Sequence, residues 1–380
     1  MPQPPAHPPV VLALSPSAGP DLSIEALRGL AAMMVVATHY AHFVVDSPGM
    51  LGLASTGVNL FFVLSGFVFA PYLHSTRWGV LPHLARRAFR MFPLYLLALA
   101  IYVLLKLPAP DATAHLGVHL LMLHTTQSPA IAFFYNPAFW SLPPELEFYL
   151  LLPLLARIVT RFGLHALLWP ALALRFVLAW PDGSDATTFT IQEISTVHLP
   201  SLLVEFLLGA WAWRWLQRAA TAVDGVTRVP RGLLAFCCAL TLLCTGHLYS
   251  AVVLVPAQTP LQQWASGQVG VLAAAAYACA VVALAGWPAL WRGRSRAAAL
   301  AVWAGHLSYG VYLLHNAAPL LLARVWPTTQ GVSALVACLV LTLAAAWAAH
   351  LAVERPMREL GRRLSWWLAR RPPQGPARSW

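Results

Sequence analysis

Charged side chains are scarce in this sequence. Asp, Glu, Lys and Arg make up only 10% of its 380 residues, whereas 59% are hydrophobic, and the mean hydropathy is +0.66. Soluble domains carry about a quarter charged residues. The composition therefore excludes a soluble globular protein and is typical of a polytopic membrane protein.

Cysteine is also rare, and none of it stands in a ligand or disulfide pattern. All five residues fall inside apolar runs: Cys237, Cys238, Cys244, Cys279 and Cys338. We interpret them as small buried hydrophobic residues, and the sequence predicts neither a disulfide framework nor a metal site.

Long apolar runs predict an all-α protein with about ten transmembrane helices. A further run, 115–126, is too short to span and is expected to lie at the interface or to re-enter. The ten predicted spans are 24–45, 56–74, 92–108, 142–157, 163–180, 199–215, 232–250, 268–288, 297–323 and 333–352.

The arginines decide the predicted orientation. With a cytoplasmic N-terminus, the outer loops receive only Lys106 and Arg324, and nearly all other basic residues fall in cytoplasmic loops and the C-terminal tail. This asymmetry is what the positive-inside rule predicts for an even number of spans with both termini in the cytoplasm. It also accounts for the net charge of +11, so we do not expect nucleic acid as a partner.

The chain divides into one large domain and two tails. Residues 1–20 are proline-rich and are expected to be a disordered N-terminal tail, residues 21–360 form the membrane domain, and residues 361–380 read as a basic cytoplasmic tail. We find no internal repeat and no separate soluble domain.

The first predicted span carries an arginine and a histidine. Ionisable side chains are costly inside a bilayer and usually face a polar cavity. Arg28 and His39 return to nearly the same helix face, roughly 16 Å apart along the axis. They predict a charged anchor near one membrane surface and a titratable imidazole toward the middle, both facing one shared polar chamber. The alternative is that Arg28 reaches lipid phosphate and His39 is a hydrogen-bonded core residue.

Three arginines lie at the start of the third span. Arg86 and Arg90 are i,i+4 neighbours with Arg87 beside them, and three guanidinium groups within one turn form a good clamp for phosphate. A phosphorylated cytoplasmic donor would suit this cluster. Positive-inside topology alone also places arginines here.

The second span is interrupted by Ser65 and Gly66 in the run GVNLFFVLSGF. Small residues allow helices to approach closely. Packing is therefore a sufficient explanation, although a direct role for Ser65 stays open.

The segment 136–153 contains two carboxylates. Glu145 and Glu147 are two residues apart, about 200° on a helix, and cannot both face one pocket. One of them could orient an imidazole or bind an acceptor hydroxyl. The alternative is a helix N-terminal acid, since Pro143 and Pro144 mark the first turn.

Polar residues recur in later spans. Ser308, Tyr312 and His315 share one helix face and line either a cavity or a helix contact. Arg175 and Glu205 fall at similar depths, and we expect them to pair because an unpaired buried charge is costly.

The order and spacing of these motifs resemble the acyltransferase-3 family of membrane acyltransferases over roughly residues 21–358. No single motif is specific, but their order is. The motifs are ALRGLAA with Arg28 followed by His39, FFVLSGF, RRxxR at Arg86, Arg87 and Arg90, WSL with Glu145 and FYLLLP, SYxxYLxH, and ERP at 354–356.

The resemblance implies an integral protein of the bacterial inner membrane that transfers an acyl group, commonly acetyl from acetyl-CoA, to a carbohydrate hydroxyl. Family acceptors include O-antigen, exopolysaccharide, peptidoglycan and macrolide antibiotics, so O-acetylation of a polysaccharide is the expected type of reaction. The expected partners are acetyl-CoA or another acyl-CoA, a carbohydrate or glycolipid acceptor, and membrane lipid.

The resemblance also implies residue roles. Arg28 and His39 would be an essential pair, the arginine cluster would hold the CoA phosphates, and Glu145 would be the functional carboxylate. The substrate cavity would be lined by Trp140, Ser141, Tyr309, Tyr312 and His315.

Two departures from the family pattern affect these expectations. This chain reads PPELE where the family often has a VEEQ-like string, which leaves the roles of Glu145 and Glu147 open. We also expect no hydrolase-like domain of the kind that some members carry, so that acceptor handling rests with the membrane domain or a separate partner.

We expect His39 to act as general base on the acceptor hydroxyl, because a near-neutral imidazole pKa suits proton abstraction, with Glu145 orienting His39 or the sugar. Relay through an acyl-histidine competes with this hypothesis. Both mechanisms stay open, and so do a monomer and a homo-oligomer.

A transporter or flippase for an anionic or glycolipid substrate is the rival function. Intramembrane Arg, His and Glu residues line transport pathways too. That function predicts repeated halves, which we do not find in the sequence.

Overall fold

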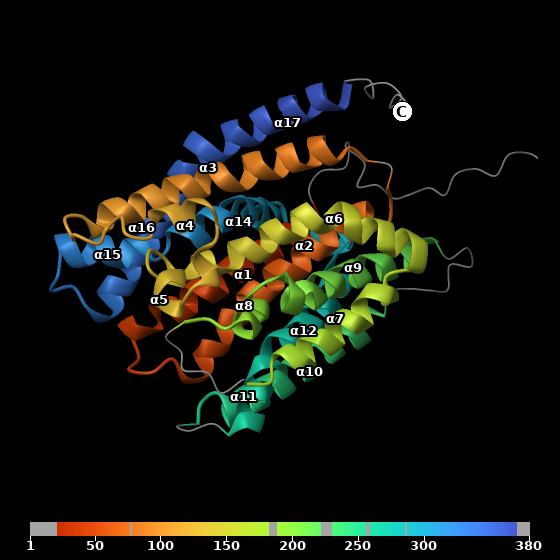
Figure 1. Cartoon of the computed structure of the whole chain (residues 1–380), viewed down its shortest axis with the longest axis horizontal. Helices are drawn as coiled ribbons and strands as arrows, with labels where there is room; N and C mark the ends of the chain where they lie inside the picture. The colour runs from red at the N-terminus through yellow and green to blue at the C-terminus, as the bar shows by residue number, and fades with distance from the viewer. Residues whose placement is uncertain are drawn as a thin grey trace, which may run out of the picture.

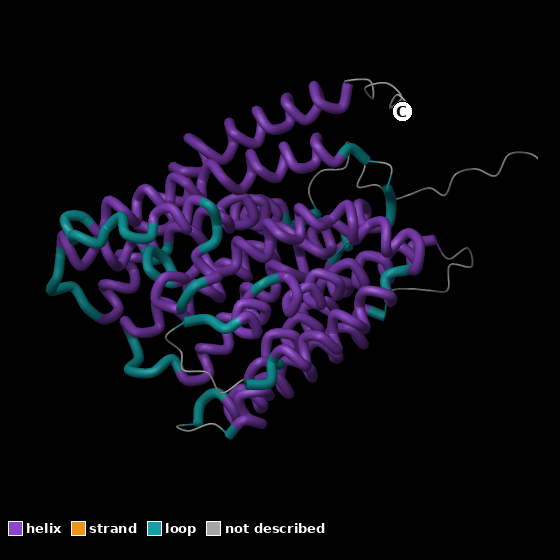
Figure 2. The backbone as a smooth tube through the Cα atoms, in the orientation of Figure 1, coloured by secondary structure: helices purple, strands orange, loops and turns teal. Residues whose placement is uncertain are grey.

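The computed structural model of the protein describes residues 21–76, 78–181, 188–221, 230–255, 259–285 and 287–370. Within these ranges the chain is helical and contains no strand (Figures 1 and 2). The all-α prediction is therefore confirmed. The expected N-terminal tail 1–20 and the last ten residues lie outside the described ranges.

Within the described ranges, eleven long helices form the architecture. They are α1 (Leu22–Tyr40), α2 (Gly57–Leu73), α3 (Val80–Lys106), α6 (Leu142–Phe162), α7 (His165–Leu178), α9 (Leu199–Thr221), α10 (Arg231–Val252), α12 (Val269–Leu284), α14 (Ser295–Leu314), α16 (Gly331–Ala349) and α17 (Arg355–Arg370). The shorter helices are α4 (Leu116–Leu120), α5 (Pro129–Ala132), α8 (Ile191–Val197), α11 (Pro260–Gly267), α13 (Pro288–Trp291) and α15 (Ala317–Val325). Short 3₁₀ turns lie at Ala41–Phe43, Gly49–Thr56, His124–Thr126 and Pro137–Ser141, and a π-helical turn lies at His350–Glu354.

Eight helices of the described ranges are long and apolar enough to span a membrane, or nine when the bent pair α6–α7 counts as one span. The protein is thus an integral membrane protein, but the predicted number of about ten is not reproduced. The difference comes from α6 and α7, between which the chain bends by 119°. The sequence shows two apolar runs there and cannot show that they form one broken unit.

Local sequence fixes where the site-bearing helices begin. Asp21 caps α1, since its carboxylate accepts hydrogen bonds from the backbone N–H groups of Ser23 and Ile24, which α1 itself cannot satisfy. Pro143 and Pro144 occupy the first turn of α6, where a missing N–H costs nothing. These starts set the depth of every site residue that follows on the two helices.

Glycines bring α2 and α9 into close contact. A Cβ atom on Gly66 would lie 1.8 Å from the carbonyl oxygen of Phe206, and one on Gly209 would lie 1.9 Å from that of Val63. No side chain fits at either distance. The packing role expected for Gly66 is therefore present in the structure.

Helix α17 lies beside the first half of α3 along one edge of the bundle (Figure 1). The pair is close enough that a Cβ atom on Gly361 would lie 2.6 Å from that of Phe89. Because α17 runs on to Arg370, the predicted boundary at residue 360 falls within a helix.

The expected ion pair between Arg175 and Glu205 does not form. Arg175 instead donates hydrogen bonds to Ser201 Oγ, at 2.9 Å, and to the carbonyl of Gly267. Glu205 is fully buried and accepts a hydrogen bond from Asn59 Nδ2 at 2.8 Å. Each group is thus bonded to polar neighbours, which lowers the cost of burying it, although Arg175 Nε and Glu205 Oε1 have no hydrogen-bond partner among the described residues.

Candidate active site

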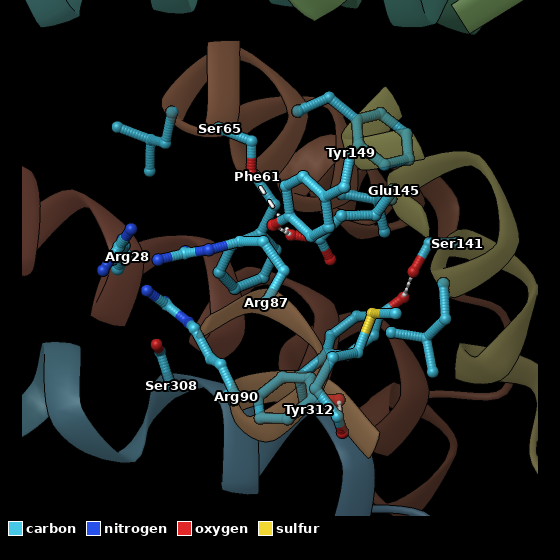
Figure 3. A pocket seen from close by; sticks show the side chains of 16 residues that line it. Arg28, Phe61, Ser65, Arg87, Arg90, Ser141, Glu145, Tyr149, Ser308 and Tyr312 are labelled. Carbon is cyan, nitrogen blue, oxygen red and sulfur yellow. Dashed lines mark hydrogen bonds between the residues drawn. The ribbon is translucent and has the colours of Figure 1, made fainter. Parts of the chain in front are cut away.

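An intramembrane pocket gathers three arginine side chains from two helices, and we call it the arginine pocket. Arg28 comes from α1, and Arg87 and Arg90 come from α3; Figure 3 shows their guanidinium groups directed at the same space. The other polar lining residues are Ser65, Ser141, Glu145, Tyr149, Ser308, Tyr309 and Tyr312.

Positive charge exceeds negative charge in the arginine pocket. Its only lining carboxylate among the described residues is Glu145, which accepts hydrogen bonds from Tyr149 and, at 3.4 Å, from Ser65. Arg87 packs 4.9 Å above the ring of Phe69. Arg90 has no hydrogen-bond or carboxylate partner in the described part of the chain. This imbalance makes the pocket suited to an anionic ligand.

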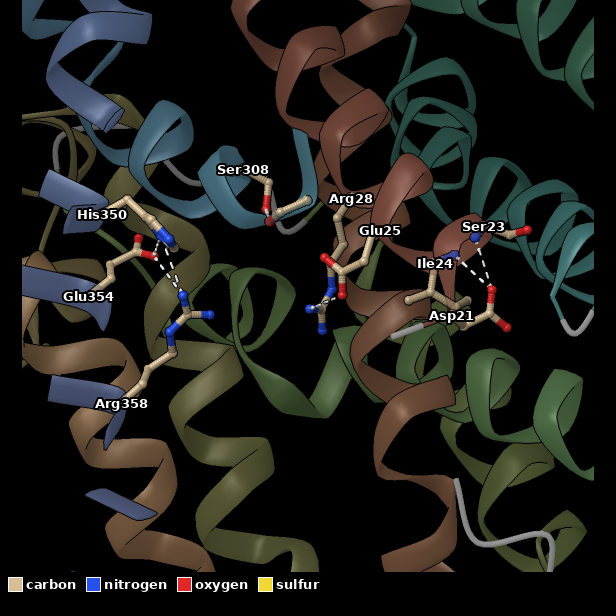
Figure 4. Close-up of polar contacts among 10 residues, drawn as sticks. Asp21, Ser23, Ile24, Glu25, Arg28, Ser308, His350, Glu354 and Arg358 are labelled. Atoms are coloured by element: carbon tan, nitrogen blue, oxygen red, sulfur yellow. Dashed lines mark hydrogen bonds and ion pairs between the residues drawn. The ribbon is translucent and has the colours of Figure 1, made fainter. Parts of the chain in front are cut away.

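A second, strongly polar cavity of about 190 Å³ adjoins the arginine pocket and shares Arg28 and Arg90 with it. On one side of it Glu25 lies 3.5 Å from Arg28 (Figure 4). On the other side Glu354 of the ERP motif lies 3.1 Å from His350 and 3.9 Å from Arg358. We call this cavity the polar vestibule.

Arg86 lies outside the arginine pocket. The prediction that all three arginines of this turn form one clamp is therefore wrong for Arg86. The guanidinium of Arg86 donates to the hydroxyl of Ser365 on α17 and, at 3.4 Å, to that of Tyr72. Because α17 packs against this side of α3, it captures Arg86. The third arginine of the pocket is Arg28.

His39 lines two cavities of its own. The first, about 290 Å³, also contains Ser55, Asn59, Trp140 and Tyr312, and we call it the histidine cavity. The second, about 360 Å³, includes His42, Lys106 and Asn316. Trp140 thus lies with His39, whereas Ser141, the next residue, lines the arginine pocket.

The ring of His39 is held by the end of α14. Its Nδ1 lies 2.6 Å from His315 Nε2, and the two rings are stacked with centroids 4.9 Å apart. Asn316 Nδ2 lies 3.4 Å from the same His39 nitrogen and donates to Asn136 Oδ1 at 2.8 Å. His315 is completely buried. It was expected as a substrate-cavity residue, but it contacts His39 instead.

Arg28 and His39 do not line the same cavity, contrary to expectation. Eleven residues of helix separate them by roughly 16 Å, which is further than one small pocket extends. Two residues connect their surroundings, because Val58 and Tyr312 line both the arginine pocket and the histidine cavity. The Tyr312 hydroxyl lies at this junction, 2.7 Å from Ser141 Oγ and 2.8 Å from the carbonyl oxygen of Ala138.

Glu145 and Glu147 are separated as their spacing predicts. Glu147 bonds His198 Nδ1 and, at 2.9 Å, the backbone N–H of Leu199, and it lines none of these cavities. Glu145 lines the arginine pocket. Its expected contact with His39 does not form, because the carboxylate is bonded to Ser65 and Tyr149.

Comparison with known proteins agrees with this architecture. The profile of the acyltransferase-3 family, an acyltransferase domain, matches residues 21–351. The chain belongs to the acyltransferase-3 family. It is also similar to acyltransferase MdmB of Streptomyces mycarofaciens, with 27% identity over 379 residues that cover 90% of this chain and 92% of that protein. No solved structure matches. Acyl transfer is therefore the general activity of this membrane protein.

Several residues that line these cavities were not predicted from the sequence as site residues. Tyr149 lies one helical turn after Glu145 and could have been found from that i,i+4 spacing. For Ser65 the sequence left packing and a direct role open. Asn59 carries no local signal at all, because only the fold brings it to the cavity of His39.

Proposed function

We propose that the protein is a membrane-embedded O-acyltransferase that moves an acyl group from cytoplasmic acyl-CoA, with acetyl-CoA as the simplest donor, to a hydroxyl group of a carbohydrate or glycoconjugate. The single observation that carries the proposal is the junction at Tyr312. There an arginine-rich pocket and a cavity containing a histidine share two lining residues, Val58 and Tyr312. Family membership supports acyl transfer as the chemistry.

The arginine pocket is the proposed donor site. CoA carries phosphate groups that need several cationic partners, and guanidinium groups bind phosphate through paired hydrogen bonds. Arg87 and Arg90 are available for this role, and Arg28 joins them although it also lies 3.5 Å from Glu25, while Arg358 in the polar vestibule lies where further phosphate could enter. The positive-inside rule favours a cytoplasmic opening for this arginine-rich region, and a bacterial inner membrane suits such a topology.

The histidine cavity is the proposed acceptor site. Trp140 offers an aromatic face, and Ser55 and Asn59 add hydrogen-bonding groups beside His39. A sugar presents apolar ring faces and hydroxyl groups, so this combination favours a carbohydrate acceptor. The amide of Asn59 is kept in one orientation by its bond to the buried Glu205.

In the proposed reaction His39 acts as general base. It removes the proton from the acceptor hydroxyl while the oxygen attacks the thioester carbonyl carbon. Collapse of the tetrahedral intermediate breaks the carbon–sulfur bond, and the imidazolium returns the proton to the leaving CoA thiolate. The products are the acyl ester and CoA-SH. The thioester must pass Tyr312 and Val58 to reach His39, since these residues line both cavities.

The test uses purified protein in lipid nanodiscs, incubated with [¹⁴C]acetyl-CoA and cell-envelope polysaccharide. We expect radiolabel in the glycan and stoichiometric CoA release, both lost in His39→Ala protein that still binds CoA. Absence of CoA binding to the folded wild-type protein would overturn the donor site and return the transporter as the better function. Full transfer by His39→Ala would overturn the role of the histidine.

A further inference from the structure

The contact between His39 and His315 fixes more than the position of a ring. A neutral imidazole carries its proton on only one nitrogen, and the hydrogen bond made by the other nitrogen selects which one. Backbone groups have unambiguous donor and acceptor roles, so they determine which nitrogen of a neighbouring histidine carries the proton.

His315 has a defined tautomer because its Nδ1 faces carbonyl oxygens. This nitrogen lies 2.9 Å from the carbonyl oxygen of Tyr312 and 3.2 Å from that of Val311. Carbonyl oxygens only accept hydrogen bonds, so His315 Nδ1 carries the proton. In the neutral ring Nε2 is then a bare acceptor.

That acceptor determines the tautomer of His39. With His315 Nε2 unprotonated, the 2.6 Å contact requires a proton on His39 Nδ1. The amide of Asn316 donates one N–H to Asn136, and its other N–H, at 3.4 Å from the same nitrogen, makes a much longer contact than the 2.6 Å one to His315. Consequently Nε2 of His39 bears the lone pair, and no group of the described chain bonds it.

The orienting ring is itself rigidly placed. His315 is completely buried, and its carbonyl oxygen accepts a 2.6 Å hydrogen bond from Tyr40, whose hydroxyl also lies 2.7 Å from Thr342 Oγ1. Three helices, α1, α14 and α16, therefore meet at this residue. Because Tyr40 follows His39 directly, the same contact sets the height of His39 against α14.

We propose that His315 is a positioning residue which holds His39 in the Nδ1–H tautomer, so that Nε2 is the nitrogen that removes the acceptor proton. This inference rests on the proposed function for its catalytic meaning, although the tautomer itself does not. When His39 Nε2 takes up a proton, its Nδ1–H bond to His315 is unchanged. The base therefore works without rearranging its neighbours, which is the condition for efficient preorganised catalysis.

Two substitutions of His315 distinguish the roles of its two ring nitrogens. Glutamine places its amide oxygen near the position of Nε2 and keeps an acceptor for His39, whereas asparagine places its amide NH₂ near Nδ1 and keeps only the bonds to the backbone. If His315 acts through His39, His315→Gln is the milder change. If it acts only as a helix-end residue, His315→Asn is the milder one.

The tautomer is measured directly by ¹⁵N NMR of histidine-labelled protein in bilayers at about pH 8, above the ordinary histidine pKa of about 6.5. The His39 signals are assigned by their absence in His39→Gln. We expect a protonated Nδ1 and a bare Nε2 in wild type and in His315→Gln, and a mixture of both tautomers in His315→Asn. A protonated Nε2 in wild type would overturn the inference.

Kinetics complete the test, with [¹⁴C]acetyl-CoA as donor and cell-envelope polysaccharide as acceptor. We expect kcat to fall on the order of 10²-fold in His315→Asn and less than about tenfold in His315→Gln, because general-base catalysis contributes about 10²-fold or more. KM for acetyl-CoA should not change in either variant. Equal losses in both variants would overturn the inference, whereas absent transfer in wild type with the expected NMR result would overturn only the proposed function.

Discussion

Neutralising Arg90 tests the donor site most sharply, because this guanidinium forms no ion pair among the described residues and lines both the arginine pocket and the polar vestibule. Arg90→Gln removes the charge and keeps a polar side chain. We expect CoA to bind more weakly to this variant, with the fold of the protein unchanged.

The magnitude follows from the surroundings of Arg90. A charge-assisted hydrogen bond contributes about 1.5–3 kcal/mol, and a unit charge at about 6 Å in an effective dielectric of about 20 contributes a similar 3 kcal/mol. The loss corresponds to an increase in Kd of roughly 10- to 150-fold. Arg87→Gln should fall at the lower end, because its guanidinium also packs on Phe69.

Arg86 provides the matched control on the same helix. Its guanidinium is bonded to Ser365 and Tyr72 rather than directed into the pocket. Arg86→Gln should therefore change the Kd of CoA by less than about threefold, as expected for a charge outside the site. The assay is isothermal titration calorimetry of CoA into protein in nanodiscs. Equal weakening by Arg86→Gln and Arg90→Gln would refute the reasoning, since it would mean that only the overall charge of α3 matters.

Three further predictions address other parts of the structure. Glu145→Gln should tighten CoA binding by up to about tenfold, because it removes the negative charge that faces the bound phosphates; a drop in kcat at unchanged Kd would instead indicate direct participation in the reaction. Gly66→Ala should cost at least about 1–3 kcal/mol of stability through overpacking and lower the thermal unfolding midpoint, whereas Gly232→Ala, which has nothing within 4 Å, should not. Burial lowers the pKa of both His119 and His124 to about 4. The free energy of unfolding should therefore be highest above about pH 7 and fall by on the order of 1–2 kcal/mol per histidine toward about pH 5. In His119→Leu the thermal unfolding midpoint should lose part of this pH dependence.

The class of the protein could be predicted from its amino-acid sequence. Long apolar runs with few charges admit only membrane-spanning helices, because a bilayer leaves no partner for backbone groups outside them. The same logic pointed to Arg28 and His39, since an ionisable side chain is costly at that depth. Clustering pointed to Arg86, Arg87 and Arg90 as a phosphate site, and the family resemblance pointed to Glu145. All of these residues except Arg86 line the cavities described above.

The grouping of these residues into sites depends on how the helices pack and could not be predicted from the sequence. Periodicity places Arg28 and His39 on one helix face, yet the cavities are formed by side chains from other helices, which assign Arg28 to one pocket and His39 to another. Arg86 was indistinguishable from its neighbours until α17, more than 260 residues away in the sequence, captured it. The partner of His39 was likewise a long-range matter, because His315 reaches it through the packing of α14 against α1. A helical pattern reports the direction of a side chain around its own axis, whereas the contact that gives the side chain its role belongs to a different helix.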